Sequence, residues 1–288
     1  MHSVINDYLE QPWAVRIGVE CFAKGAQIEL ELPFASSNLN AEGGVIHGGI
    51  IATLLNDVAR LQVDSICRDE NNGLLPLFVN DSHISYLRPS SKGRLKAVGE
   101  ILRRGKQFIF TTSRVEDEEG RCIASAHTVF MNSSTFKNPA TDLKTIEPGA
   151  DSYLEAQHTL TSMGQMMNQN LLHRLPGMEV VHLRAGHSLL LAEHRPHFSD
   201  NLGGWAPGAM LTVADNAGVF ASFQVGDRMT RSSTVSIGLT YCAETGGEDL
   251  FATGESLSHN GPLVHNQIRL FGRQSKRLLA FGTLTFLC

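Results

Sequence analysis

The chain lacks any long uninterrupted apolar run. Its most apolar stretch, residues 45–63, is interrupted by the polar side chains His47, Asn56, Asp57 and Arg60. A helix needs about 20 predominantly apolar residues to cross a bilayer, so we predict that the chain has no membrane span. The first residues also lack the basic segment and apolar core of a secretory signal, so we expect none.

Cysteine and basic charge are scarce as well. Five cysteines are spread over the chain without a CxxC pair, which favours reduced thiols and a cytoplasmic location. Asp and Glu, at 29, outnumber the 24 Lys and Arg and give a formal charge of −5. Proteins that bind nucleic acid usually carry a basic surplus on one face, so we predict no nucleic-acid partner.

Several short functional motifs are also absent. The sequence contains neither a phosphate-binding glycine signature nor the GxSxG motif of serine hydrolases. His194 and His197 lie three positions apart, but no nearby cysteine or carboxylate pattern completes a zinc site. We therefore predict no metal and no separate cofactor.

What the chain does contain is an internal repeat. Its 288 residues suit about two domains, since a domain usually takes about 100–200 residues. The segment GGVIHGGIIATLLND at 43–57 has a counterpart, GGWAPGAMLTVADN, at 203–216. Two further matches follow in the same order: Tyr86 with Tyr241, and residues 121–130 with 277–286. Ordered matches of this kind predict a duplicated domain.

The repeat predicts the same order of elements in each half. Residues 48–66 and 208–223 are apolar on nearly all faces, which predicts two buried helices. Each helix is accompanied by strand-like runs separated by turn residues. These runs are 15–32, 74–87, 95–102, 108–115 and 122–131 in the first half, and 180–195, 233–242, 250–257, 263–271 and 278–287 in the second. We predict an α+β fold in which an antiparallel sheet wraps around one central helix in each half.

The same pattern sets the expected domain boundaries. We predict an N-terminal domain at 1–132, a linker at 133–177 and a C-terminal domain at 178–288. The first part of the linker is polar and irregular, and residues 151–175 have the pattern of a helix.

Three motifs of the first half carry a family resemblance. The first is GGVIHGG at 43–49, which opens the apolar helix. The others are YLRP at 86–89, followed by Gly93, and LRRGK at 102–106. On these motifs the chain is similar to acyl-CoA thioesterases of the phenylacetate-pathway type, and both halves resemble the hotdog fold. The resemblance implies two tandem hotdog domains that form a pseudo-dimer.

Thioester hydrolysis needs donors that polarise the carbonyl oxygen, and the start of the first helix offers them. The N–H groups of a first helical turn have no partner within the helix, and the helix dipole there favours negative charge. Gly48 and Gly49 would let a thioester approach these groups closely. Asn40 and His47 add polar side chains to the same loop. We predict a carbonyl clamp here; the alternative is that the glycines serve only tight packing.

The resemblance implies a carboxylate base nine positions after the histidine, and the two halves differ there. In the first half this position holds Asn56, which cannot accept a proton at neutral pH. Asp57 follows it, about 100° further round the helix. In the second half Asp215 lies nine positions after Ala206 and eight after Pro207. Each half therefore lacks a different part of the pattern.

The resemblance further implies that a site takes its glycine clamp from one domain and its acid from the other. One site would then combine the segment 47–49 with Asp215. The other would combine Gly208 with Asn56, next to Asp57, and is expected to be degenerate.

A hydroxyl accompanies the acid in the second half. The family places it seven residues before the strand tyrosine, which is Thr234 before Tyr241. The corresponding residue before Tyr86 is Val79. We predict one complete site, with Asp215 as general base or nucleophile and Thr234 orienting the water or the carboxylate.

Basic residues in the turns of the first half are candidates to bind the phosphates of CoA. They are Arg88, Arg103, Arg104 and Lys106. The alternative is that each simply belongs to a solvated turn.

The predicted function is hydrolysis of an acyl-CoA to a free acid and CoA, with CoA entering only as part of the substrate. One alternative is a non-catalytic acyl-CoA-binding or regulatory protein. A less favoured one is a hotdog hydratase or dehydratase acting on enoyl-thioesters, because the proline-rich His loop and the Asp-containing segment of those enzymes are missing. The sequence leaves open the acyl group and whether two chains associate as a homodimer.

Overall fold

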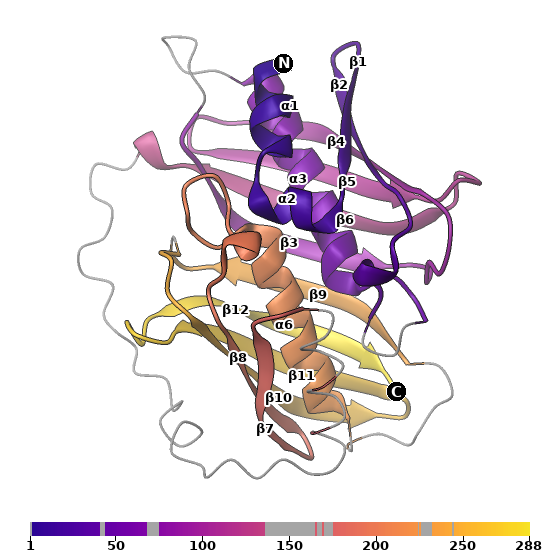
Figure 1. Cartoon of the computed structure of the whole chain (residues 1–288), viewed down its shortest axis with the longest axis vertical. Helices are drawn as coiled ribbons and strands as arrows, with labels where there is room; N and C mark the ends of the chain where they lie inside the picture. The colour runs from indigo at the N-terminus through magenta and orange to yellow at the C-terminus, as the bar shows by residue number, and fades with distance from the viewer. Residues whose placement is uncertain are drawn as a thin grey trace.

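The computed structural model describes residues 2–40, 44–67, 75–135, 165, 169, 175–223, 225, 232–243 and 245–288. Twelve strands form one antiparallel sheet, and the two long helices lie side by side within its curve (Figure 1). This arrangement agrees with the predicted antiparallel sheet around central helices.

The first half begins with two helices that the sequence analysis did not predict. Its elements are α1 (His2–Leu9), α2 (Pro12–Ile17), β1 (Glu20–Lys24), β2 (Gln27–Leu32), η1 (Ser36–Asn38), α3 (Gly48–Ile66), β3 (Leu77–Tyr86), β4 (Leu95–Arg104), β5 (Phe108–Glu116), β6 (Cys122–Asn132) and η2 (Ser133–Thr135). The expected strand at 15–32 is therefore wrong at its start, and the runs 15–32 and 180–195 each hold a pair of strands where one was expected. Pro12 suits the first turn of a helix and Gly18 ends it with a φ of 75°, so these two residues were the missed signal.

The second half repeats the order of the first after its initial helices. Its elements are β7 (Met178–Arg184), β8 (His187–Ala192), η3 (Pro196–Phe198), α6 (Pro207–Ser222), β9 (Ser233–Tyr241), β10 (Leu250–Asn260), β11 (Leu263–Gly272) and β12 (Leu278–Leu287). Helix α6 begins one residue before its predicted start because proline fits the first helical position.

Two strands run further than their apolar pattern predicted. Strands β4 and β10 continue to Arg104 and Asn260, past a register shift in each. A β-bulge adds a residue to one strand and so breaks the alternation of apolar and polar side chains. The alternation of apolar and polar residues therefore ended at the bulge, whereas the hydrogen-bonded pairing of the strands continued beyond it.

The order of strands in the sheet is symmetrical about its centre. It reads β1-β2-β4-β5-β6-β3 and then β9-β12-β11-β10-β8-β7, so that corresponding strands of the two halves lie at equal distances from the middle. The halves meet where β3 pairs antiparallel with β9, with Ile84 opposite Ile237. This β3–β9 seam makes the sheet continuous across the whole chain.

The two long helices touch through reciprocal glycine–threonine contacts. A Cβ at Gly49 would lie 2.4 Å from Thr212 Cα, and one at Gly208 would lie 2.2 Å from Thr53 Oγ1. Each threonine hydroxyl in turn donates to the carbonyl of the glycine in its own helix, at 2.9 Å and 3.0 Å. The close approach of α3 and α6 therefore requires glycine at both positions.

Helix α2 also connects the two halves. Trp13 of α2 donates its ring N–H to Thr53 and its backbone N–H to Ser199 O in the second half. The Trp13 ring also packs on Phe198 at 5.8 Å. Most of the predicted linker, including the expected helix at 151–175, lies outside the described residues, and the predicted domain boundaries stay a prediction.

Candidate functional site

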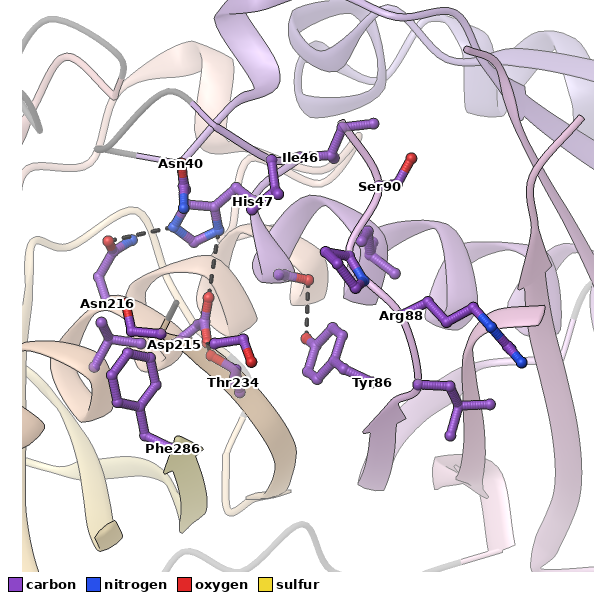
Figure 2. Close-up of a pocket in the computed structure, with 18 of the residues that line it drawn as sticks. Asn40, Ile46, His47, Tyr86, Arg88, Ser90, Asp215, Asn216, Thr234 and Phe286 are labelled. Carbon is purple, nitrogen blue, oxygen red and sulfur yellow. Dashed lines mark hydrogen bonds and ion pairs between the residues drawn. The ribbon is translucent and has the colours of Figure 1, made fainter. Parts of the chain in front are cut away.

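A cavity of about 230 Å³ lies between the start of α3 and the middle of α6. Residues of both halves line it (Figure 2). The first half contributes Asn40, His47, Gly48 and the segment 86–90, whereas the second contributes Asp215, Asn216 and Thr234. The structure therefore brings Asn40, His47 and Gly48 of the predicted clamp, though not Gly49, to the same cavity as Asp215 and Thr234.

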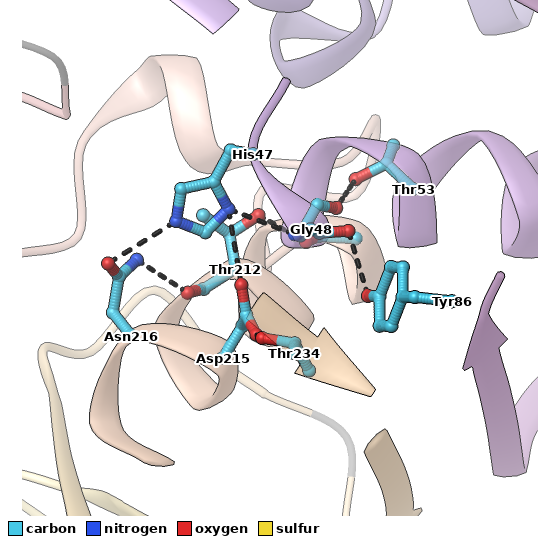
Figure 3. Close-up of polar contacts among 10 residues, drawn as sticks. His47, Gly48, Thr53, Tyr86, Thr212, Asp215, Asn216 and Thr234 are labelled. Carbon is cyan, nitrogen blue, oxygen red and sulfur yellow. Dashed lines mark hydrogen bonds and ion pairs between the residues drawn. The ribbon is translucent and has the colours of Figure 1, made fainter. Parts of the chain in front are cut away.

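His47 caps the first turn of α3. Its Nδ1 accepts the Gly49 N–H at 2.9 Å, which satisfies one of the free donors of the helix start. The same Nδ1 lies 3.4 Å from Asp215 Oδ2, and Nε2 lies 3.3 Å from Asn216 Oδ1 (Figure 3). The ring is 8% exposed, so these three contacts define its surroundings.

Asp215 is held from its own half and faces the other. Its Oδ1 accepts the Thr234 hydroxyl at 2.8 Å, and the residue is 4% exposed. Burial raises the pKa of Asp215, whereas the Thr234 bond and the Gly49 N–H partly offset this rise, as a positive charge on His47 would if its ring were protonated. Burial therefore favours the neutral carboxyl, and its hydrogen-bond donors favour the carboxylate.

A side chain at position 48 would displace the Asp215 carboxyl. A Cβ there would lie 2.9 Å from Asp215 Oδ2 and 3.4 Å from the Tyr86 ring. As the first helical residue, Gly48 also presents an N–H with no acceptor within the helix. Both properties suit a place where a substrate carbonyl meets the backbone.

Gly49 has a different environment from the one predicted. Its N–H already donates to His47, and its Cα faces Thr212 of the opposite helix. The packing alternative thus accounts for the glycine at 49, as it does for Gly208. Asn40 lines the cavity, and its Oδ1 accepts the Gly44 N–H at 3.2 Å.

Tyrosines fix the starts of both helices. The Tyr86 hydroxyl donates to Gly48 O at 2.9 Å, and Tyr241 donates to Pro207 O at 3.2 Å. Burial and the charge of Asp215 raise the pKa of Tyr86 well above its usual range, so its hydroxyl stays a donor. Because the contact occurs in both halves, its role is to anchor the helix start.

The structure aligns the two helices from their N-cap residues. His47 and Ala206 are the N-caps, so Asn56 and Asp215 both lie nine positions further and are equivalent. Asp57 and Asn216 are equivalent in the same way. The two halves thus carry the same pair of residue types in opposite order.

The predicted second site is not assembled. Asn56 Oδ1 accepts from Ser82 at 2.8 Å and from Thr128 at 2.9 Å, both on strands of its own half. Asp57 Oδ2 accepts the Tyr8 hydroxyl of α1 at 2.9 Å. Gly208 packs against Thr53, so the structure does not join it to Asn56 in a site.

The four residues predicted to bind CoA lie in two separate places in the structure. Arg88 lines the cavity, where its Nη1 also donates to Cys122 O at 2.6 Å. Arg103, Arg104 and Lys106 lie in and beside the β4–β5 turn, at the Leu77 end of the strands. Tyr86 and the cavity lie at the other end, so the structure does not bring this turn to Arg88. The antiparallel register, which the sequence motif did not reveal, separates the turn from Arg88, and the binding of CoA by these residues stays a prediction.

The remaining polar candidates have structural partners. His194 Nε2 lies 3.1 Å from the Ser199 hydroxyl, and His197 Nε2 lies 3.2 Å from Pro176 O. In the part of the chain that the structure describes, no three His, Cys, Asp or Glu side chains gather as metal ligands. None of the described helices combines the length and apolar character that a membrane span requires.

Residues 43–124 match the family model described as the Thioesterase superfamily. A tesB protein of Mycobacterium avium subsp. paratuberculosis has a similar solved structure, with 13% identity, a TM-score of 0.64, and 99% of this chain and 98% of that one covered. The chain resembles the thioesterases of the hotdog fold. An acyl-CoA thioesterase II, TesB2, of Mycobacterium marinum gives 13% identity, a TM-score of 0.58, and coverage of 93% and 95%.

A third structure is described as a conserved protein of unknown function with a hotdog fold, from Alicyclobacillus acidocaldarius. It shares 12% identity and a TM-score of 0.61, with 97% of each chain covered. At these identities the likeness establishes the hotdog fold. No protein among the curated sequences matches this chain.

Proposed function

We propose that the chain is an acyl-CoA thioesterase that hydrolyses an acyl-CoA to a free acid and CoA at one composite site between two tandem hotdog domains. The observation that carries the proposal is the position of Asp215. Its carboxyl, bonded to Thr234 at 2.8 Å, lies against Gly48 at the start of the opposite helix. A base and a carbonyl clamp thus face the same cavity.

In the proposed reaction Asp215 acts as a general base. A water bonded to the carboxylate attacks the thioester carbonyl carbon and gives one proton to Asp215. The C–S bond then breaks, and the CoA sulfur leaves with the bonding electron pair and takes the proton from Asp215. The other water hydrogen stays on the acid product, so Asp215 returns to its starting form.

The developing negative charge on the carbonyl oxygen is stabilised by the start of α3. The Gly48 N–H and the positive end of the helix dipole favour an oxyanion there. Gly49 supports the site indirectly, because its N–H fixes the His47 ring at 2.9 Å. Asn40 completes the polar side of the clamp.

The two ends of the cavity differ in character, which suggests how an acyl-CoA lies in it. Val219, Phe220, Phe223 and Phe286 provide an apolar wall from the second half. Arg88, which is exposed, stands on the side of the first half. The acyl group would lie along the apolar wall, with a phosphate of CoA near Arg88.

This reaction needs no cofactor and no metal, and its only partner is the substrate. The five cysteines of the structure are all free, which suits a reducing cytoplasm. Association of two chains into a homodimer is compatible with the proposal but not required by it.

The test is release of the CoA thiol from acyl-CoAs of different chain length, followed with a thiol reagent. We expect Asp215→Asn to lower kcat by about 100-fold or more, the usual contribution of a general base. Asp57→Asn is the matched control and should keep its activity, because its side chain bonds to Tyr8 outside the cavity lining. Loss of activity in Asp57→Asn but not in Asp215→Asn would refute the composite site. Binding of acyl-CoA without thiol release would instead favour the non-catalytic alternative.

A further inference from the structure

Asn216 of α6 has a side chain whose orientation is fixed by its own helix. Its Nδ2 donates to Thr212 O at 2.8 Å, so the Oδ1 atom is the one turned towards His47, 3.3 Å from Nε2 (Figure 3). A carbonyl oxygen only accepts hydrogen bonds, so the hydrogen in this contact belongs to Nε2. Reversing the amide would set two oxygens, Oδ1 and Thr212 O, against each other.

The other nitrogen of the ring supports the same assignment. His47 Nδ1 accepts the Gly49 N–H at 2.9 Å, and an accepting ring nitrogen carries a lone pair in place of a proton. The same lone pair faces Asp215 Oδ2 at 3.4 Å, so a hydrogen bond from a protonated Asp215 would share it with the Gly49 N–H. This arrangement repels an ionised carboxylate and attracts a protonated carboxyl.

We infer that Asn216 is a positioning residue, which holds His47 as the Nε2–H tautomer so that Nδ1 accepts a hydrogen bond from Asp215 when that carboxyl carries the proton taken from water. The kinetic part of this inference rests on the proposed thioesterase function. The Oδ2–H of Asp215 donates to Nδ1 until the C–S bond breaks, and the proton then moves to the leaving sulfur. His47 keeps its Nε2 proton throughout and shows no net change.

The equivalent position of the first half is consistent with this pairing. There the residue is Asp57, the opposite N-cap is Ala206, and the carboxyl bonds to the Tyr8 hydroxyl at 2.9 Å. An amide thus occurs opposite the histidine, and a carboxyl occurs where no ring is present. A carboxylate opposite Nε2 would instead favour a second proton on the ring, which would remove the acceptor at Nδ1.

The experiment reads the tautomer directly, by 15N NMR of the histidine rings in the full chain. The signals of His47 are identified by their loss in His47→Asn, a variant whose side chain can still accept the Gly49 N–H. We expect a neutral ring protonated at Nε2 in the wild type. In Asn216→Ala the Gly49 N–H still favours this tautomer, but the Nε2 signal should shift because its acceptor is lost and some Nδ1–H form should appear; in Asn216→Asp both nitrogens should carry protons.

Kinetics on the same variants give the second readout. With acyl-CoA, Asn216→Ala should lower kcat by about 10-fold, as expected for loss of one hydrogen bond worth about 1.4 kcal/mol, while KM stays within about twofold. The matched control is Asn201→Ala, an exposed asparagine whose side chain bonds to Asp7 O away from the cavity. It should leave both constants unchanged.

The outcomes separate the inference from the proposed function. A wild-type His47 protonated at Nδ1, or an Asn216→Ala variant with unchanged His47 signals, would overturn the inference even if the protein hydrolyses acyl-CoA. Absence of hydrolysis by the wild type would overturn the function, and the NMR spectrum would still decide the tautomer. Should Asn216→Ala unfold, the ring state of Asn216→Asp decides, because a ring that stays neutral there would also contradict the inference.

Discussion

Replacing Asp57 by asparagine should stabilise the protein more at alkaline than at acidic pH. Asp57 is partly buried, and this burial raises its pKa from 3.8 to about 7, although the Tyr8 bond and the charge of Arg60 favour the ionised form. In the unfolded chain the carboxyl ionises near its ordinary pKa. Between these two pKa values the folded state therefore binds more protons than the unfolded state, and stability falls as the pH rises.

The size of the effect follows from the same two pKa values. A pKa of about 7 in place of 3.8 corresponds to a loss of at most about 4 kcal/mol once the pH exceeds 7. At pH 5 only about 1.5 kcal/mol of this loss is present. Asparagine does not ionise, so the stability of Asp57→Asn relative to the wild type should increase by up to about 3 kcal/mol between pH 5 and pH 8. Any fixed cost of the new amide is the same at both pH values and cancels.

The measurement is urea unfolding of both proteins at pH 5, 6, 7 and 8, followed by the fluorescence of the buried Trp13 and Trp205. Asp7→Asn serves as the control, because Asp7 is exposed on α1 next to Tyr8. That variant should differ from the wild type by less than about 0.5 kcal/mol at every pH. If the difference between Asp57→Asn and the wild type is the same at pH 5 and pH 8, the buried carboxyl does not have a raised pKa and the reasoning fails.

Three further predictions concern the cavity. Thr234→Val removes the hydroxyl that favours the ionised form of Asp215, so its pKa should rise and the acidic limb of the pH–rate profile should move to higher pH; Thr234→Ser should restore the profile. Gly48→Ala places a Cβ 2.9 Å from Asp215 Oδ2. This variant should lower kcat by about 10-fold or more and the free energy of unfolding by about 1–3 kcal/mol. Gly44→Ala is the control and should change neither quantity, because no atom lies within 4 Å of its Cβ. Arg88→Ala should raise the KM for an acyl-CoA up to about fivefold and leave the KM for the matching acyl-pantetheine unchanged, and equal effects on both would contradict a phosphate contact.

Much of the fold could be predicted because its signals are local. Segments apolar on nearly all faces predicted the two central helices to within a residue of their starts, and the alternating runs predicted the later strands. The short helix α2 was missed because it has only six residues, from Pro12 to Ile17. So short a segment is too brief to show the repeating apolar pattern of a helix. The bulges in β4 and β10 were missed because they break the alternation on which the prediction of strands depends.

The candidate site, too, could be predicted only where its signals are local in the sequence or come from the family resemblance. The pairing of the 47–49 segment with Asp215 was predicted from the family resemblance together with the different losses in the two repeats, and His47, Gly48 and Asp215 line one cavity in the structure. The orientation of the Asn56 side chain could not be predicted from the sequence. Its hydrogen-bond partners, Ser82 and Thr128, lie on two strands that are distant from Asn56 in the sequence. The β4–β5 turn lies far from Arg88 for a similar reason, since strand register places it at the opposite end of the sheet.

The β3–β9 seam has a consequence for how such a chain can vary. In a dimer with two-fold symmetry every substitution occurs in both copies, so a residue that improves one site alters the other equally. Within one chain the two copies of a position change independently, and Asn56 and Asp215 are one such pair. The covalent link also holds the halves at a high effective concentration, so that dilution, which would dissociate two separate copies, leaves this pairing intact.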